Sequence, residues 1–113
     1  MRIKIDPLDK LFSQYIRLRD GGVCQRCGGK GNQTSHFYSR AKRSLRWDDS
    51  NACLLCFGCH HYFHAYPLEH VEFWKHRLGE EAFTNLQARA NTPQKPDREL
   101  IKILLKKLVE EIE

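Results

Sequence analysis

The sequence lacks any continuous run of about 18 apolar residues, the length that a helix needs to cross a bilayer. Its first residues, MRIKIDPLDKLF, are charged and lack the apolar segment of a secretory signal. It also lacks internal repeats and low-complexity tracts. These absences argue against a membrane-spanning, secreted or repeat protein and predict a cytoplasmic one.

The cysteines cannot all pair as disulfides, because their number, five, is odd. Reduced thiols in an intracellular compartment, available to bind zinc, are the simplest interpretation. The 113 residues have room for one compact domain, 1–113. The core of so short a chain is thin, and thin cores often depend on a metal or on disulfides.

Charge of one sign is not in large excess: 19 Lys and Arg against 14 Asp and Glu give a net charge of +5. This balance is compatible with nucleic-acid binding without being diagnostic of it. The distribution is more informative, because one stretch of seven residues contains four bases and no acid. These bases are Arg40, Lys42, Arg43 and Arg46.

The first predicted helix covers residues 6–20. Asp6 is a suitable N-cap, Pro7 suits the first helical position and Gly21 can end the helix in a left-handed conformation. Its apolar residues recur at helical spacing and are expected to pack on the core without any chemical role. They are Leu8, Leu11, Phe12, Tyr15 and Leu18.

The remaining pattern predicts an α+β fold: an N-terminal helix, a two-stranded hairpin and helix around zinc (24–64), and a helical C-terminal half (67–113). The expected strands are 34–38 and 51–55, and the expected helices are 57–65, 67–78, 80–90 and 98–112, with a linker at 91–97. The last helix is strongly amphipathic, so its apolar stripe must dock on the core or on a partner chain. The stripe contains Ile101, Leu104, Leu105, Leu108 and Ile112.

Two Cys-x-x-Cys pairs, Cys24/Cys27 and Cys56/Cys59, predict one tetrahedral zinc site. The 28 residues between the pairs exceed the insert of a simple zinc ribbon, so another structure occupies it. Cys53 and Cys56 also have knuckle spacing. The pair Cys56/Cys59 is preferred because Gly58 favours its turn, which leaves Cys53 as a small apolar core residue.

A rival zinc site would use Cys24, Cys27, His60 and His64. The 32-residue gap between Cys27 and His60 is far longer than the roughly 12 residues of two-Cys, two-His fingers, and Cys56 and Cys59 would lose their role. With zinc on the four cysteines, the histidines are free for other chemistry. His60 and His64 are four residues apart, so they share one helix face and can hold one cation together.

The run SHFYSR…WDDSNACLLCFGCHHYFH resembles the HNH endonucleases, in the subgroup whose ββα-metal motif is held by two Cys-x-x-Cys pairs. The resemblance covers about residues 24–64. Small members of this family are often phage-encoded, so a bacteriophage protein acting in an infected bacterial cell is expected. The pairing of His60 with His64 is similar to that in the nuclease domains of bacterial colicins.

The resemblance implies a metal-dependent DNA endonuclease. His36 would be the general base, Asn51 would hold His36 or its loop, and His60 with His64 would bind a catalytic divalent cation, Mg²⁺, Mn²⁺, Ni²⁺, Co²⁺ or Zn²⁺. Flanking DNA phosphates would be contacted without base specificity. The residues expected to make these contacts are Arg40, Lys42, Arg43 and Arg46.

One position departs from the family pattern. Many members carry Asp or His as a metal ligand immediately before the general base, where this chain has Ser35. His61 or Asp49 is an alternative source of a ligand. His70 and His76 are expected on helix surfaces, and Trp47 and Trp74 in the core.

Two other functions stay open at this stage. One is a zinc-stabilised DNA-binding module without catalysis, which Ser35 favours. The other is a zinc-ribbon interaction module whose helix at 98–112 pairs with a partner protein or with a second copy of the chain. In this case, polar substitutions at Leu104 and Leu108 would disrupt the interaction.

Overall fold

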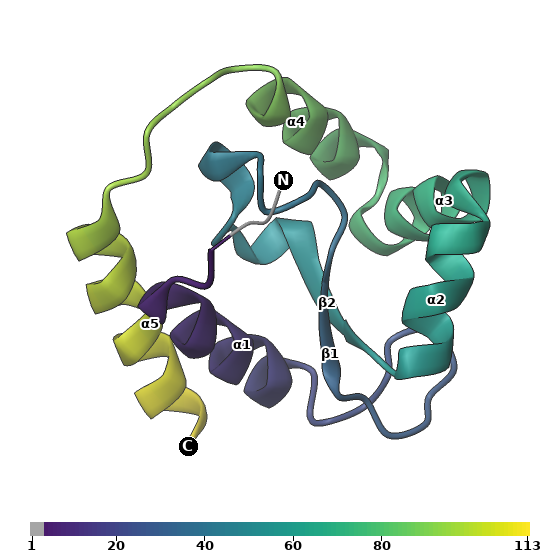
Figure 1. Ribbon diagram of the computed structural model, residues 1–113, viewed down its shortest axis with the longest axis horizontal. Helices are drawn as coiled ribbons and strands as arrows, with labels where there is room; N and C mark the ends of the chain where they lie inside the picture. Colours follow the sequence, from purple (N-terminus) through teal and green to yellow (C-terminus); the bar gives the residue numbers. More distant parts are fainter. Residues whose placement is uncertain (1–3) are drawn as a thin grey trace.

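The computed structural model describes residues 4–113 and has a mostly helical α+β fold (Figure 1). An N-terminal helix precedes a small β-hairpin, which lies next to a cluster of four cysteines, and the C-terminal half is helical. The elements are α1 (Pro7–Arg19), β1 (Gln33–His36), β2 (Ala52–Leu55), α2 (Phe57–Ala65), α3 (Pro67–Leu78), α4 (Glu80–Ala90) and α5 (Arg98–Ile112). Two short 3-10 turns, Arg43–Leu45 and Asp49–Asn51, lie in the loop between the strands.

The signals at the ends of α1 act as predicted. The side chain of Asp6 accepts a hydrogen bond from the Leu8 amide, and the side chain of Asp9 accepts one from the Asp6 amide, so the two acids form a capping box. Gly21 follows the helix with φ +65°, a conformation that glycine adopts without steric cost. Helices α2, α3, α4 and α5 also begin and end where the sequence predicts.

The hairpin strands are shorter than predicted. β1 and β2 pair antiparallel from Gln33 opposite Leu55 to His36 opposite Ala52. The first strand stops before residue 38 because the backbone N–H and C=O of Tyr38 bond to the side chain of Asn51 and not to a strand. Asn51 itself lies in a 3-10 turn, so the second strand starts one residue later than predicted.

Helix α5 docks on α1 of the same chain (Figure 1). Leu105 and Val109 are buried in a core cluster with Phe12 and Ile16. The predicted apolar stripe was wrong at its outer flank: Leu104 is 50% exposed and Ile112 is 44% exposed. Because α5 is covered by α1 along one side only, Val109 takes the buried place and the outer flank stays in water.

A second apolar cluster lies under α2, α3 and α4, around Trp74, Phe63 and Phe83. Trp74 is fully buried, as expected for a core tryptophan. The hairpin therefore lies between two groups of helices, α1 with α5 on one side and α2, α3 and α4 on the other (Figure 1). Along residues 4–113 no helix combines the length and the apolar character needed to cross a membrane.

Candidate metal centres and active-site pocket

The four predicted cysteines come together at the point where β2 leads into α2. Their Sγ atoms all lie within 4.8 Å of one another, and those of Cys27 and Cys56 are 3.9 Å apart. Zinc bound to four thiolates at about 2.3 Å in a tetrahedron requires sulfurs about 3.8 Å apart. The cluster therefore fits a structural Zn²⁺ site, as the spacing of Cys24, Cys27, Cys56 and Cys59 predicts.

Cys53 lies outside this cluster. It is fully buried in β2, and burial raises the pKa of its thiol to about 12, which keeps it protonated. Because the Sγ of Cys59 lies in the cluster and that of Cys53 does not, the preference for Cys56/Cys59 over Cys53/Cys56 is confirmed. Arg26 lies beside the cluster: it donates a hydrogen bond to the Sγ of Cys59 at 3.4 Å and covers the ring of Tyr62 at 3.8 Å. This cation offsets part of the negative charge that four thiolates carry.

A separate open pocket of about 590 Å³ is lined by residues of α1, β1, α2 and α3 and of the loop after β1. Three of the predicted site histidines, His36, His60 and His64, line it. They come from two elements, since His36 ends β1 and the other two lie on α2. The structure therefore brings together in one cavity imidazoles that the sequence separates by as many as 28 positions.

The ring of His36 is held in one orientation. Its Nε2 lies 2.9 Å from the backbone oxygen of Arg46, and the ring packs against Phe12 at 5.6 Å. A carbonyl oxygen only accepts hydrogen bonds, so in the neutral ring Nε2 carries the proton and Nδ1 carries the lone pair. Burial lowers the pKa of His36 below its usual value, although the bond to the Arg46 carbonyl acts in the opposite direction.

Asn51 braces the loop that follows β1. It is fully buried, and its side chain accepts a hydrogen bond from the Tyr38 amide (2.9 Å) and donates to the carbonyls of Tyr38 (3.0 Å) and Leu45 (3.1 Å). Of the two roles predicted for Asn51, the structure shows contacts to the loop and no hydrogen bond to the His36 ring within the described residues. The loop that Asn51 holds leads to Arg46, whose carbonyl accepts from His36.

His60 and His64 point their Nε2 atoms at each other across 3.3 Å. Two imidazoles bound to one cation at about 2.0–2.1 Å place their nitrogens about 3.0–3.4 Å apart, so the pair fits a shared divalent ion. Ser35 is buried beside them, and its Oγ lies 3.2 Å from Nδ1 of His60. If Nδ1–H donates to this oxygen, the lone pair of His60 is on Nε2, facing His64.

Within residues 4–113, no third His, Cys, Asp or Glu side chain lies close enough to share a cation with the histidine pair. Over residues 4–113, the cysteine cluster is the one group of three or more His, Cys, Asp or Glu side chains close enough to hold a metal. His61 packs on the ring of Phe57 at 4.3 Å, and Asp49 does not line the pocket, so neither completes the site. Burial and the neighbouring His64 and His61 lower the pKa of His60, which favours the neutral, metal-binding form.

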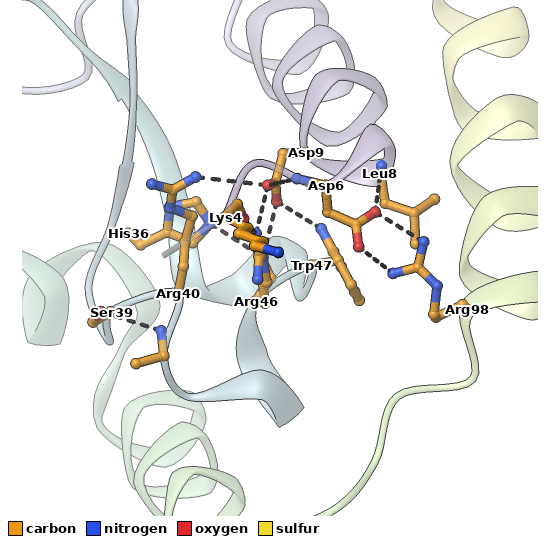
Figure 2. Close-up of polar contacts among 11 residues, drawn as sticks. Lys4, Asp6, Leu8, Asp9, His36, Ser39, Arg40, Arg46, Trp47 and Arg98 are labelled. Atoms are coloured by element: carbon orange, nitrogen blue, oxygen red, sulfur yellow. Dashed lines mark hydrogen bonds and ion pairs between the residues drawn. The ribbon is translucent and has the colours of Figure 1, made fainter. Parts of the chain in front are cut away.

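Of the four predicted DNA-contacting bases, Arg40 and Arg46 lie close to Asp9 (Figure 2), whereas Lys42 and Arg43 do not pair with it. Arg46 is engaged within the protein: its guanidinium donates to both carboxylate oxygens of Asp9 (3.0 and 2.6 Å) and to the carbonyl of Lys4 (2.7 Å). Arg40 lines the pocket and lies 3.6 Å from the same carboxylate. Lys42 and Arg43 are exposed and form no ion pair with any residue in 4–113.

Sequence reasoning missed Asp9, because α1 was expected to do no more than pack. Its carboxylate lines the pocket and accepts hydrogen bonds from Arg46, the Trp47 indole (2.9 Å) and the Asp6 amide (2.8 Å) (Figure 2). Burial alone would raise its pKa, but these bonds outweigh burial and lower it, so Asp9 stays ionised. The capping-box spacing of Asp6 and Asp9 was the available signal.

His70 was also misjudged, since it is half-buried beside the pocket and not fully exposed on a helix surface. It lines the pocket, stacks on Phe63 at 4.7 Å, and accepts a hydrogen bond from the Trp74 indole at 3.1 Å. Burial lowers its pKa to about 4, so the ring is neutral near pH 7. The four-residue spacing from Trp74 on α3 was the signal in the sequence. His76 is exposed, as expected.

Comparison of the chain with protein-family models, with curated proteins and with solved structures found no match in any of the three. The site must therefore be interpreted from its own geometry.

Proposed function

We propose that this protein is a metal-dependent DNA endonuclease of the HNH kind. The observation that carries the proposal is the convergence of His36, His60 and His64 on one pocket, with a lone pair on His36 Nδ1 and a cation-sized separation between the other two rings. A general base beside a metal-binding pair is what phosphodiester hydrolysis requires. The adjoining cysteine cluster supports the proposal by fixing the start of α2, where His60 lies.

In this mechanism His36 acts through Nδ1. The nitrogen takes a proton from a water molecule while the oxygen of that water attacks phosphorus. The bond from phosphorus to the 3′ oxygen then breaks. The products carry a 5′-phosphate and a 3′-hydroxyl, whose proton comes from solvent water. The imidazolium left on His36 then returns its proton to solvent. Since burial lowers the pKa of His36, the ring is unprotonated and ready at neutral pH.

His60 and His64 would hold the divalent cation through Nε2, and Ser35 would keep His60 in the required tautomer. When bound, the cation neutralises charge on the phosphate and stabilises the departing 3′ oxygen. Because the pair supplies two protein ligands, other coordination positions of the cation would be available to water and to a phosphate oxygen. Imidazole ligands favour Mn²⁺, Ni²⁺, Co²⁺ or Zn²⁺ more than an all-oxygen site would.

Basic residues beside the pocket would hold the DNA backbone. The exposed Lys42 and Arg43 are the freest of the predicted four, and Arg40 reaches the pocket itself. Arg46 is better suited to a structural role, because its guanidinium is already bonded to Asp9. Binding through phosphates carries no base preference and weakens as salt rises.

A supercoiled-plasmid assay tests this function. Zinc-loaded wild type with added Mg²⁺, Mn²⁺ or Ni²⁺ should nick or linearise the plasmid, and His36→Ala should not, because the base is lost. His76→Ala is the matched control, since it removes an exposed imidazole that does not line the pocket. If folded, zinc-loaded wild type cuts with none of these metals, the nuclease proposal fails.

A zinc-stabilised DNA-binding module without catalysis is the second candidate. It is favoured by the lack of a third His, Cys, Asp or Glu ligand beside His60 and His64 in the part of the chain described. This candidate expects no cutting by the wild type, together with a salt-dependent affinity for DNA. That affinity would fall when Lys42 and Arg43 are changed to Gln.

A further inference from the structure

A second groove, of about 460 Å³, lies between α1 and α5. It is lined by residues of these two helices only, and four of them are basic against a single acid, Glu99. The basic residues are Lys10 of α1 and Arg98, Lys102 and Lys106 of α5. The lining of the groove therefore carries a net positive charge, and the groove was not among the sites that the sequence suggested.

The positive charge in this groove is mostly uncompensated. Arg98 is paired with Asp6, but Lys10, Lys102 and Lys106 form no ion pair with any residue in 4–113. Three bases follow one another at intervals of four along α5, so they lie on one helix face. Like charges at this spacing destabilise a helix. A polyanion lying in the groove would relieve this repulsion.

The groove and the histidine pocket lie on either side of α1, which contributes residues to both. Asp9 and Ser13 line the pocket, whereas Lys10 and Gln14 line the groove. A helix with its side chains is about 10–12 Å across. Duplex DNA carries one negative charge per about 1.7 Å of its axis, so a duplex held at the pocket presents several further phosphates over that distance.

We propose that this groove binds the backbone phosphates of duplex DNA that flank the site of cleavage. The inference rests on the proposed function for the identity of the polyanion. Charge complementarity and the position of the groove one helix away from the pocket favour DNA over an acidic protein segment. Lysine ammonium groups bind phosphate as point charges without a fixed geometry, so the groove would add affinity and no sequence preference.

Duplex binding across a series of NaCl concentrations tests the groove, with His36→Ala in every protein to prevent cutting. The double variant Lys102→Gln/Lys106→Gln should lower the slope of log K against log salt by about 1.8, or 0.9 for each lost phosphate contact. Lys95→Gln/Lys107→Gln is the matched control, with the same charge change. Lys107 is on α5 but does not line the groove, and Lys95 lies in the linker.

The outcomes separate this inference from the proposed function. Cutting by the wild type together with equal slopes for the two double variants would overturn the groove and leave the nuclease standing. A lower slope for the groove variant alone supports the groove, even if the wild type proves unable to cut. Equal slopes, together with loss of polyglutamate binding by the groove variant, would assign the groove to an acidic protein segment. A wild type that binds no duplex would overturn both proposals.

Discussion

The carboxylate of Asp9 accepts hydrogen bonds from Nε and Nη2 of Arg46 at 3.0 and 2.6 Å, and the backbone oxygen of Arg46 lies 2.9 Å from Nε2 of His36 (Figure 2). An acid on α1 thus fixes the residue whose carbonyl orients the proposed base. Asp9 is a positioning residue in this scheme, since it acts on His36 through Arg46.

Asp9→Asn should lower kcat by roughly 10- to 100-fold with a smaller effect on KM, because small displacements of a catalytic group cost about this much. Asp6→Asn is the control: it loses the pair with Arg98 on the same helix end but does not touch Arg46. Steady-state kinetics on plasmid or duplex substrate measure the effect. Equal losses in the two variants would mean that Asp9 acts only on stability.

The pKa of His36 should respond in opposite directions to two neighbouring charges. Burial is the main cause of its lowered pKa, while the charge of Arg40 lowers it further and that of Asp9 raises it. We therefore expect Arg40→Gln to raise the pKa of His36 and Asp9→Asn to lower it, as measured by NMR titration of the imidazole. Shifts of the same sign in both variants would contradict this account.

The same pKa sets the acid limb of the pH–rate profile. The base must be unprotonated, so activity should be lost as pH falls through the pKa of His36, below the usual value of about 6.5. In Arg40→Gln the acid limb should move to higher pH. Zinc content should be measured at each pH, because protonation of thiolates releases metal.

Ser35→Ala should weaken binding of the second divalent cation by about 10- to 100-fold, the usual effect of removing the partner of a metal-binding histidine. Titration calorimetry of Mn²⁺ into zinc-loaded protein measures this. Ser39→Ala is a suitable control, since Ser39 also lines the pocket but bonds the Ala41 amide and no histidine. An unchanged affinity in Ser35→Ala, with binding abolished in His64→Ala, would show that His60 needs no help from Ser35.

Cys27→Ser should lose zinc and most of the cooperative thermal unfolding transition, because metal binding at such a site contributes directly to folding. Cys53→Ala should keep one zinc per chain and lose about 1 kcal/mol of stability for its smaller buried side chain. Metal analysis and thermal denaturation distinguish the two. Zinc loss in Cys53→Ala with retention in Cys59→Ser would move the ligand set to the rival knuckle Cys53/Cys56.

The helices and the cysteine cluster were predictable because their signals are local. Caps such as Asp6, helix-ending glycine and Cys-x-x-Cys spacing act within a few residues, and the structure bears them out. The role of Asp9 was not predictable, since it depends on a loop 37 positions away that folds against α1. Arg46 was grouped with the DNA contacts for the same reason: its sequence neighbours are basic, whereas its spatial neighbour is an acid.

The buried side of α5 shows a second limit. The spacing of apolar residues predicted the amphipathic helix and its span. Which flank of α5 is buried depends on where α1 packs against it. Leu104 and Val109 are both apolar, and the sequence alone does not rank them. His70 illustrates the converse, because a polar residue on a helix becomes half-buried when the ring of Phe63 happens to lie beneath it.

The pairing of Asp6 with Arg98 joins residues 92 positions apart. On the ribosome, α1 emerges early, yet the helix that covers it is made only after the hairpin, both cysteine pairs and all the pocket histidines. A growing chain therefore carries its metal ligands before α5 can cover the apolar face of α1. Under the proposed function, the proposed base and every proposed metal ligand would already be synthesised when α5 docks on α1.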